Sequence, residues 1–311
     1  MKPYYEGWYM KQQQGDDVLA VIPGRAQDHA FIQVITQNGS HYLTYPLASY
    51  QLDRLNGPRT ASQNATFKAR SADERFRNTA SSEALAAFPR MRVGDSTFCP
   101  VGMELDIREP DLELVGAFCY RDTTPLRSDI MGPFGLIPME TKHTVFSMRH
   151  RVDGCVRLND QLLRFDNAAG YMEGDRGHSF PQSYTWIQSV DLPSHASVML
   201  AIAEIPLGPI RFTGCIAVIM LNGVEYRLAT YRGVRILHAD ERLVEIAQGD
   251  MNLRVEVPKT NGHRLQAPDQ GAMRRSIHES PAGPAHFTFT KHGATLLDSM
   301  SEHASYEYVV R

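Results

Sequence analysis

Short apolar runs alternate with turn signals along most of the 311-residue chain. Asx-Gly pairs stand between several of these runs, where a two-residue β-turn needs residues that tolerate positive φ angles. The pairs are Asn38-Gly39, Asp153-Gly154, Asn222-Gly223 and Asn261-Gly262. A fifth pair, Asn56-Gly57, runs into Pro58 and is more typical of a loop. This pattern predicts an all-β protein.

Three hairpins are predicted by the runs that flank these pairs. They join residues 29–35 to 41–45, residues 144–152 to 155–165, and residues 215–221 to 224–231. In the first run, Phe31, Gln33 and Ile35 share one face, while Ile32 and Val34 share the other. Both faces are largely apolar, so such a strand needs cover on each side, as a barrel wall against a second domain provides.

Helix is scarce in the pattern. A capping box at Ser71-Ala72-Asp73-Glu74 and helix formers before Pro89 predict one or two short helices between residues 71 and 89. The length fits two domains, and we place the boundary near residues 160–170. Residues 1–165 then form an N-terminal domain and residues 166–311 a C-terminal one.

Composition narrows the choice of partners and compartment. The formal charge is −3 and the basic residues are scattered, which argues against a nucleic-acid partner. We find no apolar signal segment and no run approaching the roughly 18 uncharged residues of a membrane span. Cys99, Cys119, Cys155 and Cys215 lack C-x-x-C spacing. We expect four reduced thiols packed as small apolar groups in a cytoplasmic protein.

Several chemistries lack their sequence signatures. No Gly-rich phosphate loop, H-E-x-x-H or paired-histidine spacing is present, so we expect no cofactor and no metal. The stretch Gly177-His178-Ser179-Phe180-Pro181 resembles a nucleophile elbow, but its last position is proline. Glu173 and Asp175, two residues apart, cannot flank a sugar ring from opposite sides as a glycosidase pair does.

The first segment that stands out is Tyr4 to Lys11, which concentrates aromatic residues around one carboxylate. An extended conformation puts Glu6, Trp8 and Met10 on one face and Tyr5, Tyr9 and Lys11 on the other. Composition alone favours an amphipathic first strand with Glu6 at the surface or in a salt bridge.

The second segment runs from residue 170 to 188. Its glycines and proline predict a loop, followed by a strand that places Tyr184, Trp186 and Gln188 on one face. Loops held by a rigid scaffold often carry binding and catalytic groups. The alternative is a glycine-rich turn with a surface pair between Asp175 and Arg176.

These two segments resemble the tocopherol cyclase-like family. Its members open with Tyr/Phe-Glu-Gly-Trp-Tyr and carry Glu-x-x-Trp-Gly-x-x-Phe-Pro-x-x-x-x-Trp-x-Gln at mid-chain. The matching stretches here are Tyr5-Glu6-Gly7-Trp8-Tyr9, Glu173-Gly174-Asp175-Arg176-Gly177-His178-Ser179-Phe180-Pro181 and Trp186-Ile187-Gln188. Weaker similarity continues, in the same order, through residues 222–226 and 265–268.

The resemblance implies two lipocalin-like β-barrel domains, as in the carotenoid hydratases and other two-barrel cyclases, with an apolar pocket between or inside them. Plant and cyanobacterial members close a prenylated quinol into a chromanol ring. The implied activity is therefore a cofactor-independent, acid-catalysed cyclisation or hydration of an isoprenoid lipid.

Such chemistry requires an acid that keeps its proton at neutral pH, which a carboxyl group does in an apolar site that raises its pKa. Water must be excluded, and aromatic faces stabilise the developing cation. Glu173 or Asp175 is our candidate acid, and Glu6 beside Trp8 is a further one. His178 is the alternative proton donor, or the acceptor of the phenol proton.

The remaining candidates are assigned to the ligand. Trp8, Tyr184 and Trp186 would line the cation, with Tyr171 and Phe180 near Glu173, and Gln33 and Gln188 would orient a hydroxyl group. Arg176 departs from the family pattern, which has tryptophan there. It either turns outward onto Asp175 or recognises a carboxylate or phosphate of the ligand.

Three classes of function remain open at this point. The first is the cofactor-independent enzyme. The second is a non-catalytic lipocalin-like protein that binds an apolar or anionic amphiphile. The third is a β-sandwich that binds carbohydrate or protein through exposed Trp8 and Trp186.

Overall fold

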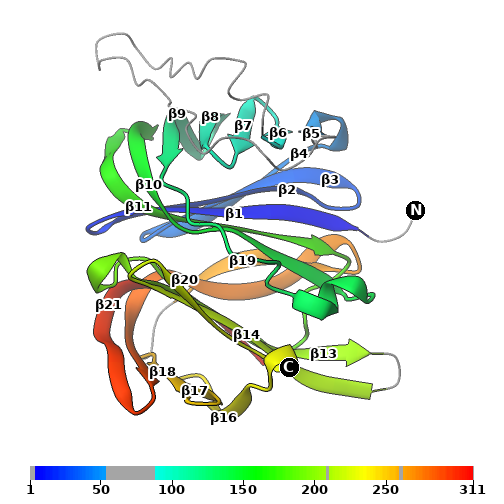
Figure 1. The fold of residues 1–311 in the computed structure, drawn as a ribbon. Helices are drawn as coiled ribbons and strands as arrows, with labels where there is room; N and C mark the ends of the chain where they lie inside the picture. The colour runs from blue at the N-terminus through cyan, green and yellow to red at the C-terminus, as the bar shows by residue number, and fades with distance from the viewer. Residues whose placement is uncertain (1–3, 54–87, 208–209, 259–261, 311) are drawn as a thin grey trace.

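Antiparallel strands make up almost all of the molecule (Figure 1). The computed structural model describes residues 4–53, 88–207, 210–258 and 262–310. Within these ranges the helical segments are short 3₁₀ turns: η1 (Leu47–Ser49), η2 (Gly132–Leu136), η3 (Pro193–His195) and η4 (Thr230–Arg232). The all-β fold class is thus confirmed. The predicted short helices and the Asn56-Gly57 loop fall almost entirely on residues 54–87, outside the described residues.

The first sheet contains eleven strands and forms the N-terminal barrel, in the order β4-β3-β2-β1-β11-β10-β9-β8-β7-β6-β5. The strands are β1 (Tyr5–Gln14), β2 (Asp17–Arg25), β3 (His29–Thr36), β4 (Gly39–Pro46), β5 (Tyr50–Asp53), β6 (Arg90–Val93), β7 (Ser96–Cys99), β8 (Gly102–Glu109), β9 (Leu112–Arg121), β10 (Thr141–Leu158) and β11 (Gln161–Gly177). They curl around an apolar core that includes Met10, Val21 and Phe118.

The second sheet contains ten strands and forms the C-terminal barrel, in the order β15-β14-β13-β12-β21-β20-β18-β17-β16, with β19 also paired to β20. The strands are β12 (Tyr184–Ser189), β13 (Ser197–Leu207), β14 (Ile210–Leu221), β15 (Val224–Ala229), β16 (Arg235–Ala239), β17 (Leu243–Gln248), β18 (Met251–Glu256), β19 (His263–Asp269), β20 (Ala272–Lys291) and β21 (Ala294–Val309). Its core includes Leu200 and Phe287. The side chain of Gln248 ties β17 to β15, accepting from Ala229 N at 2.9 Å and donating to Arg227 O at 3.1 Å.

Strands at the junction of the barrels are apolar on both faces, as the sequence predicts. In β3, Ile32 and Val34 pack in the core of the N-terminal barrel, whereas Phe31 and Gln33 face a cavity on the other side. Residues 216–221 of β14 divide in the same way between the second core and the junction. The cover predicted for such strands is therefore the other barrel.

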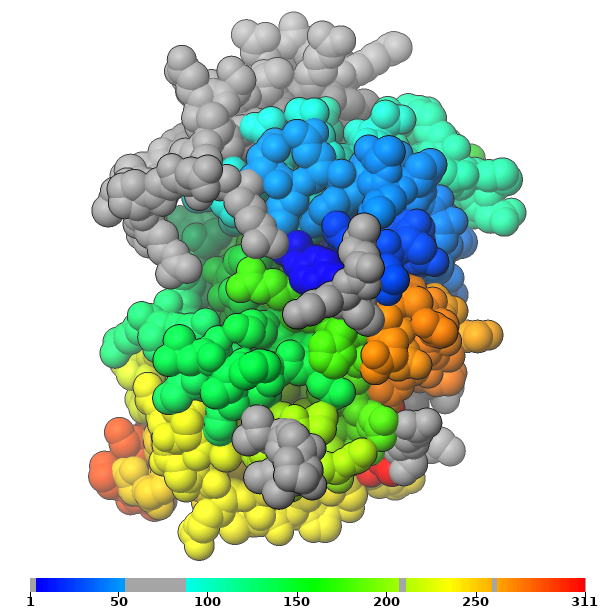
Figure 2. All heavy atoms as spheres, turned by 90° about the vertical axis from the view of Figure 1, so that its right-hand side faces the viewer, coloured from blue at the N-terminus to red at the C-terminus, as the bar shows by residue number. Residues whose placement is uncertain are grey.

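The two barrels are joined by hydrogen bonds from the β19–β20 hairpin, which lies against the N-terminal barrel (Figure 2). The side-chain amide of Gln33 donates to Gln266 O at 3.0 Å and accepts from Gln266 N at 2.8 Å. Gln27 N donates to Gly271 O at 2.8 Å. These bonds fix the spacing of the walls that enclose the cavity.

The change from one sheet to the other falls between Gly177 and Tyr184. Residues 166–177, which the boundary near 160–170 assigns to the C-terminal domain, complete β11 of the first sheet. We propose that the domain division follows the sheets and lies in the connection between β11 and β12.

Turn chemistry was predicted correctly at one Asx-Gly pair, and at a second pair the hairpin was predicted correctly, although its turn is Gln37-Asn38 and Gly39 begins β4. Asn222 and Gly223 join β14 to β15 with φ angles of 51° and 75°, as a two-residue hairpin turn requires. β3 and β4 form the hairpin expected near Asn38. Asn261 lies outside the described residues, and the strands on either side of it pair with β20.

The hairpin predicted at Asp153-Gly154 is wrong. β10 runs straight through this pair, and the chain turns instead at Asn159 and Asp160. Gly154 has φ +145° beside a register shift in β10, so its glycine marks an irregularity within a strand. An Asx-Gly pair alone does not show whether the chain turns there or continues as an irregular strand.

Gly154→Ala is expected to destabilise the protein by about 2 to 4 kcal/mol, because a Cβ there would overlap the carbonyl oxygen of Ala117 and the φ angle is unfavourable for alanine. Urea unfolding of the variant measures the change. Gly39→Ala is the matched control, since no atom lies within 4 Å of its Cβ position, and we expect a change within about 0.5 kcal/mol. Equal effects of the two substitutions would contradict this reading of β10.

The thiols behave as the sequence predicts. All four cysteines are free, and Cys99, Cys119 and Cys215 are buried. Burial raises the pKa of both Cys119 and Cys215 to about 12.

No helix in the described part of the chain has the length and apolarity to cross a membrane.

Candidate functional site

A large cavity lies between the two barrels and includes about 1430 Å³ of atom-free space, counting its mouth. β1, β3, β10 and β11 of the first sheet form one side, and β12, β14, β19 and β21 of the second form the other. Most lining residues are apolar or aromatic, among them Ile22, Phe31, Phe134, Met273 and Ile277. Apolar cavities with a few polar groups are typical of small-molecule sites.

One wall carries His143 between two carboxylates. Its Nδ1 lies 3.0 Å from Asp175 Oδ1, and its Nε2 lies 3.3 Å from Glu173 Oε2. The geometry follows from strand pairing, because Asp175 is opposite both His143 of β10 and Gly7 of β1, while Glu173 is opposite Tyr9. Residues opposite one another in antiparallel strands project from the same face. The wall is therefore a product of the β1–β11–β10 register.

The charge of this triad follows from its burial and its partners. Burial alone would lower the pKa of His143, but the adjacent Glu173 and Asp175 raise it well above its ordinary value. The protonated imidazole is therefore favoured, with Nδ1 hydrogen-bonded to Asp175 and Nε2 at ion-pair distance from Glu173. We call His143, Glu173 and Asp175 the charged triad.

Glu173 is held in place by two further donors. The hydroxyl group of Tyr171 and the indole Nε1 of Trp186, at 3.3 Å, both donate to Glu173 Oε2. Trp186 belongs to the second sheet, so this carboxylate also links the two barrels. Its orientation is fixed before any ligand enters.

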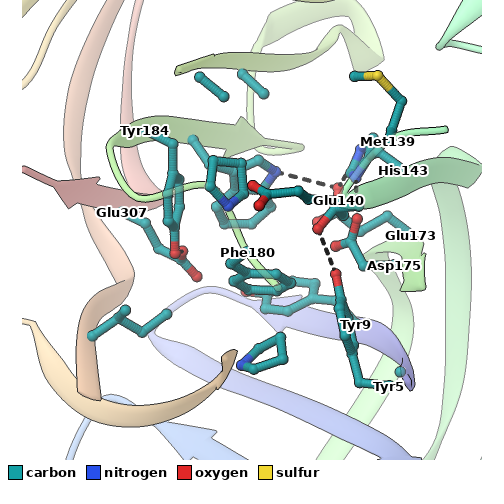
Figure 3. Close-up of a pocket in the computed structure, with 18 of the residues that line it drawn as sticks. Tyr5, Tyr9, Met139, Glu140, His143, Glu173, Asp175, Phe180, Tyr184 and Glu307 are labelled. Carbon is teal, nitrogen blue, oxygen red and sulfur yellow. Dashed lines mark hydrogen bonds and ion pairs between the residues drawn. The ribbon is translucent and has the colours of Figure 1, made fainter. Parts of the chain in front are cut away.

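The opposite wall carries Glu307 and Tyr184 (Figure 3). The hydroxyl group of Tyr184 donates to Glu307 Oε2, and both side chains line the cavity. Burial and the neighbouring Glu279 raise the pKa of Glu307 well above its ordinary value, although the bond from Tyr184 lowers it. The raised pKa favours the protonated form of Glu307.

Behind this wall, Glu279 is completely buried. Its Oε1 accepts a hydrogen bond of 2.7 Å from the hydroxyl group of Tyr9, a residue that lines the cavity. Burial raises the pKa of Glu279 to about 7, against the lowering effects of Tyr9 and Lys11. Burial in turn lowers the pKa of Lys11 to about 8, while Asp191 and Glu279 raise it.

This raised pKa predicts a pH-dependent stability. The folded state binds a proton at Glu279 that the unfolded chain releases near pH 4.5, so this group lowers the free energy of unfolding as pH rises from about 5 to 7. Tyr9, Lys11, Glu173 and Glu307 are the titratable groups that face it. In Glu279→Gln the fall in unfolding free energy between pH 5 and 8 should be smaller by up to about 3 kcal/mol. Chemical denaturation at both pH values measures it, and an unchanged fall would contradict the assignment.

Aromatic rings lie between the two walls. The rings of Tyr9 and Trp186 meet edge to face with centroids 5.2 Å apart, and Phe180 packs in the same way against Tyr5 at 5.5 Å and Tyr184 at 6.1 Å. Figure 3 shows Phe180 between the charged triad and the Tyr184–Glu307 pair. A cation formed in this space would face several π systems.

The charged triad also contains ligand types that bind metals. One atom from each of its three residues lies within 4.8 Å of the others. In the present arrangement both nitrogens of His143 face the carboxylates, and a metal would have to replace one of these contacts. We therefore interpret the triad as ion-paired.

Several residues that the sequence analysis selected do meet at this cavity. Those that line it are Glu173, Asp175, Gln33, Phe180, Tyr184 and Trp186. Tyr171 is fully buried beside them and reaches the site through its bond to Glu173. Gln33 is also one of the ties between the barrels, since its amide is bonded to the backbone of Gln266.

The other selected residues lie elsewhere. Glu6 and Trp8 project from the opposite face of β1, into the N-terminal barrel, where Trp8 packs on Phe146. Arg176 is exposed and lies on the face of β11 opposite to Asp175. Arg176 thus turns outward, as the first of its two predicted roles requires, but it does not lie on the face of Asp175 and it does not line the cavity.

His178 and Gln188 also lie outside the cavity lining. The backbone of His178 is bonded to Glu140 O, at 2.9 Å, and to Gly271 N, at 2.6 Å. Gln188 is completely buried deeper in the junction, and its amide atoms make no hydrogen bond with any described residue. Trp186 is buried as well, which does not fit the carbohydrate-binding alternative.

Sequence reasoning missed His143, Glu307, Tyr9 and Glu279 as site residues. They come from β10, β21, β1 and β20, and only the pairing of strands distant in the sequence brings them together. One signal was available for Tyr9, because the alternation in residues 4–11 already put it on the face opposite to Glu6.

Solved structures of three proteins align with nearly the whole chain. CghA aligns with a TM-score of 0.56 and 9% identity over 99% of this chain and 88% of its own. Kievitone hydratase from Nectria haematococca has a TM-score of 0.48 and 11% identity, over 99% of this chain and 89% of its own. An AttH-type protein from Nitrosomonas europaea has a TM-score of 0.47 and 10% identity, over 99% and 92%.

No protein-family model matches the sequence, and no curated protein matches it either. The similarity to CghA establishes the fold class, an all-β protein of two lipocalin-like barrels, and at 9% identity it establishes the fold alone.

Proposed function

We propose that this protein is a cofactor-independent enzyme that cyclises or hydrates a prenylated quinol or related isoprenoid lipid by acid–base catalysis. The observation that carries the proposal is the position of Glu307, an acid whose pKa is raised, opposite the charged triad across one apolar cavity. The resemblance of residues 5–9 and 173–188 to the tocopherol cyclase-like family supports the substrate class.

In the cyclisation, Glu307 gives its proton to the less substituted carbon of a trisubstituted alkene, so that a C–H bond forms and a tertiary cation develops. The phenol oxygen attacks the cation, and its proton passes to a carboxylate of the charged triad, Asp175 or Glu173. The reaction is an isomerisation that consumes no other reactant. In hydration, water takes the place of the phenol.

The cavity supports this chemistry in three ways. Apolar surroundings and acidic neighbours raise the pKa of Glu307, and its Oε2 is already bonded to Tyr184, which leaves Oε1 to carry a proton. Tyr9, Phe180 and Trp186 present rings to the cation. The apolar lining excludes the bulk water that would compete for it.

A decisive experiment is incubation of the protein with a prenylated hydroquinone, followed by solvent extraction and identification of the products. The proposal predicts a chromanol or a hydrated side chain. Recovery of bound but unchanged hydroquinone would indicate the non-catalytic binder instead. Ala203→Trp, which fills part of the cavity, is expected to abolish both binding and turnover.

A further inference from the structure

After each turnover of the proposed reaction, the proton that Glu307 needs lies on the opposite wall of the cavity, at the charged triad. Glu307 has lost its proton to the alkene, and the charged triad has gained the proton of the phenol. Before the next turnover one proton must therefore cross from the triad wall to Glu307, although the overall reaction neither gains nor loses protons. The groups that join the two walls are candidates for this return.

We propose that Glu279 returns the proton to Glu307 between turnovers, with Tyr9 as its link to the triad wall. The inference rests on the proposed function, and it assigns a role to a buried acid that the reaction itself does not use. Glu279 is therefore a relay and positioning residue, since it does not line the cavity.

Strand register places Glu279 between the two walls. Glu307 of β21 is directly opposite Glu279 of the neighbouring strand β20. On its other neighbouring strand, β12, it is opposite Trp186. The Cβ atoms of such opposite residues lie about 5 Å apart and their side chains share a face. Glu279 and Glu307 are thus neighbours in one row of the second sheet.

The link to the other wall is Tyr9. Its hydroxyl group donates to Glu279 Oε1 at 2.7 Å, and on β1 it is the cross-strand partner of Glu173. A hydroxyl group can pass its own proton to one neighbour while it accepts another from the opposite side. The hydroxyl oxygen also contacts Ser305 Oγ at 3.1 Å. Once it exchanges this contact for one with the triad wall, Tyr9 can move one proton from the Glu173 side to Glu279 without a net change in its own protonation.

The surroundings of Glu279 suit a group that carries a proton transiently. Its Oε2 makes no hydrogen bond with any described residue, so this oxygen is available to Glu307. Lys11 lies nearby as a buried cation, held by bonds from Nζ to His303 O at 2.7 Å and Ser305 Oγ at 3.0 Å. Burial raises the pKa of Glu279 to about 7, so both of its protonation states are accessible near neutral pH.

The sequence of transfers balances. A carboxylate of the triad releases the phenol-derived proton toward Tyr9 O, and Tyr9 O–H gives its proton to Glu279. Glu279 O–H then gives its proton to the Glu307 carboxylate. At the end Glu307 is protonated, and both Glu279 and the triad have returned to their starting states.

Rapid-quench kinetics with a prenylated hydroquinone test this relay in Glu279→Gln. The amide oxygen can still accept from Tyr9 but carries no proton to Glu307. We expect the first turnover within about twofold of wild type and the following turnovers about tenfold slower, a change of ~1.4 kcal/mol in the limiting barrier. Product should therefore appear as a burst of one equivalent per protein. Glu245→Gln on β17 is the matched control and should alter neither phase, because this carboxylate lies outside the cavity and accepts hydrogen bonds from Asn252 and Arg254.

Two results would overturn the relay: equal loss of the first and later turnovers, as a structural role predicts, or no change in either. Failure of the proposed function looks different, because the wild type would then form no product. Infrared spectroscopy of the protonated carboxyl band remains informative in that case. Removing the negative charge of Glu279 should lower the pH at which Glu307 loses its proton, and an unchanged pH would show that the two acids are not coupled.

Discussion

Glu307→Gln is expected to lower kcat for a prenylated hydroquinone by about 10²- to 10⁴-fold, the usual contribution of a general acid. Glutamine has nearly the same shape and can still accept from Tyr184, but it cannot donate a proton strong enough to reach an alkene. KM should stay within about twofold, because the cavity keeps its lining. Steady-state kinetics at neutral pH measure both constants.

Glu245→Gln controls for the loss of a carboxylate outside the cavity, and it should leave kcat unchanged. A Glu307→Gln variant with kcat within tenfold of wild type would remove Glu307 from the mechanism. The acid would then have to be sought among the other carboxyl groups of the cavity.

The second large effect is expected for His143→Gln, which should destabilise the fold by about 3 to 5 kcal/mol at pH 7 and abolish turnover. The variant leaves Glu173 and Asp175 buried without their shared cation, and breaking such an ion pair is costly. Because the folded-state pKa of His143 is raised, its stabilisation is fully present below about pH 6.5 and is lost as pH rises through that higher pKa. The difference from wild type should therefore narrow in alkaline solution.

The chain contains a close control for this experiment. His286 also lies between two carboxylates, 2.7 Å from Asp298 and 3.4 Å from Glu256, but at the surface of the second barrel. His286→Gln should cost less than about 1 kcal/mol, as exposed ion pairs usually do. Equal losses in the two variants would show that burial does not determine the strength of the triad.

Much of the fold was predictable from local pattern. Alternation along residues 5–11 and 31–35 assigned the two faces of β1 and β3 correctly, since side chains on a strand alternate strictly. The same rule could not tell which face meets the cavity. Glu6 and Trp8 were selected because the family motif is dense there, yet they lie on the face that fills the N-terminal barrel.

The candidate site was predictable in part for a similar reason. Glu173, Asp175 and Trp186 lie close together in the sequence, and their short segment marks the junction between the barrels. Glu307 meets Trp186 only through the pairing of β12 with β21, and His143 meets Asp175 only through the pairing of β10 with β11. Such non-local pairing leaves no trace in periodicity or turn chemistry.

The central claim is that one wall of an apolar cavity delivers a proton to a substrate carbon. Turnover of a prenylated hydroquinone in deuterium oxide tests it most directly, because protonation converts an alkene CH into a stereogenic CHD centre. The account predicts one carbon-bound deuterium in a single configuration, determined by NMR of the isolated chromanol. Equal amounts of both configurations, or a chromanol without carbon-bound deuterium, would contradict it.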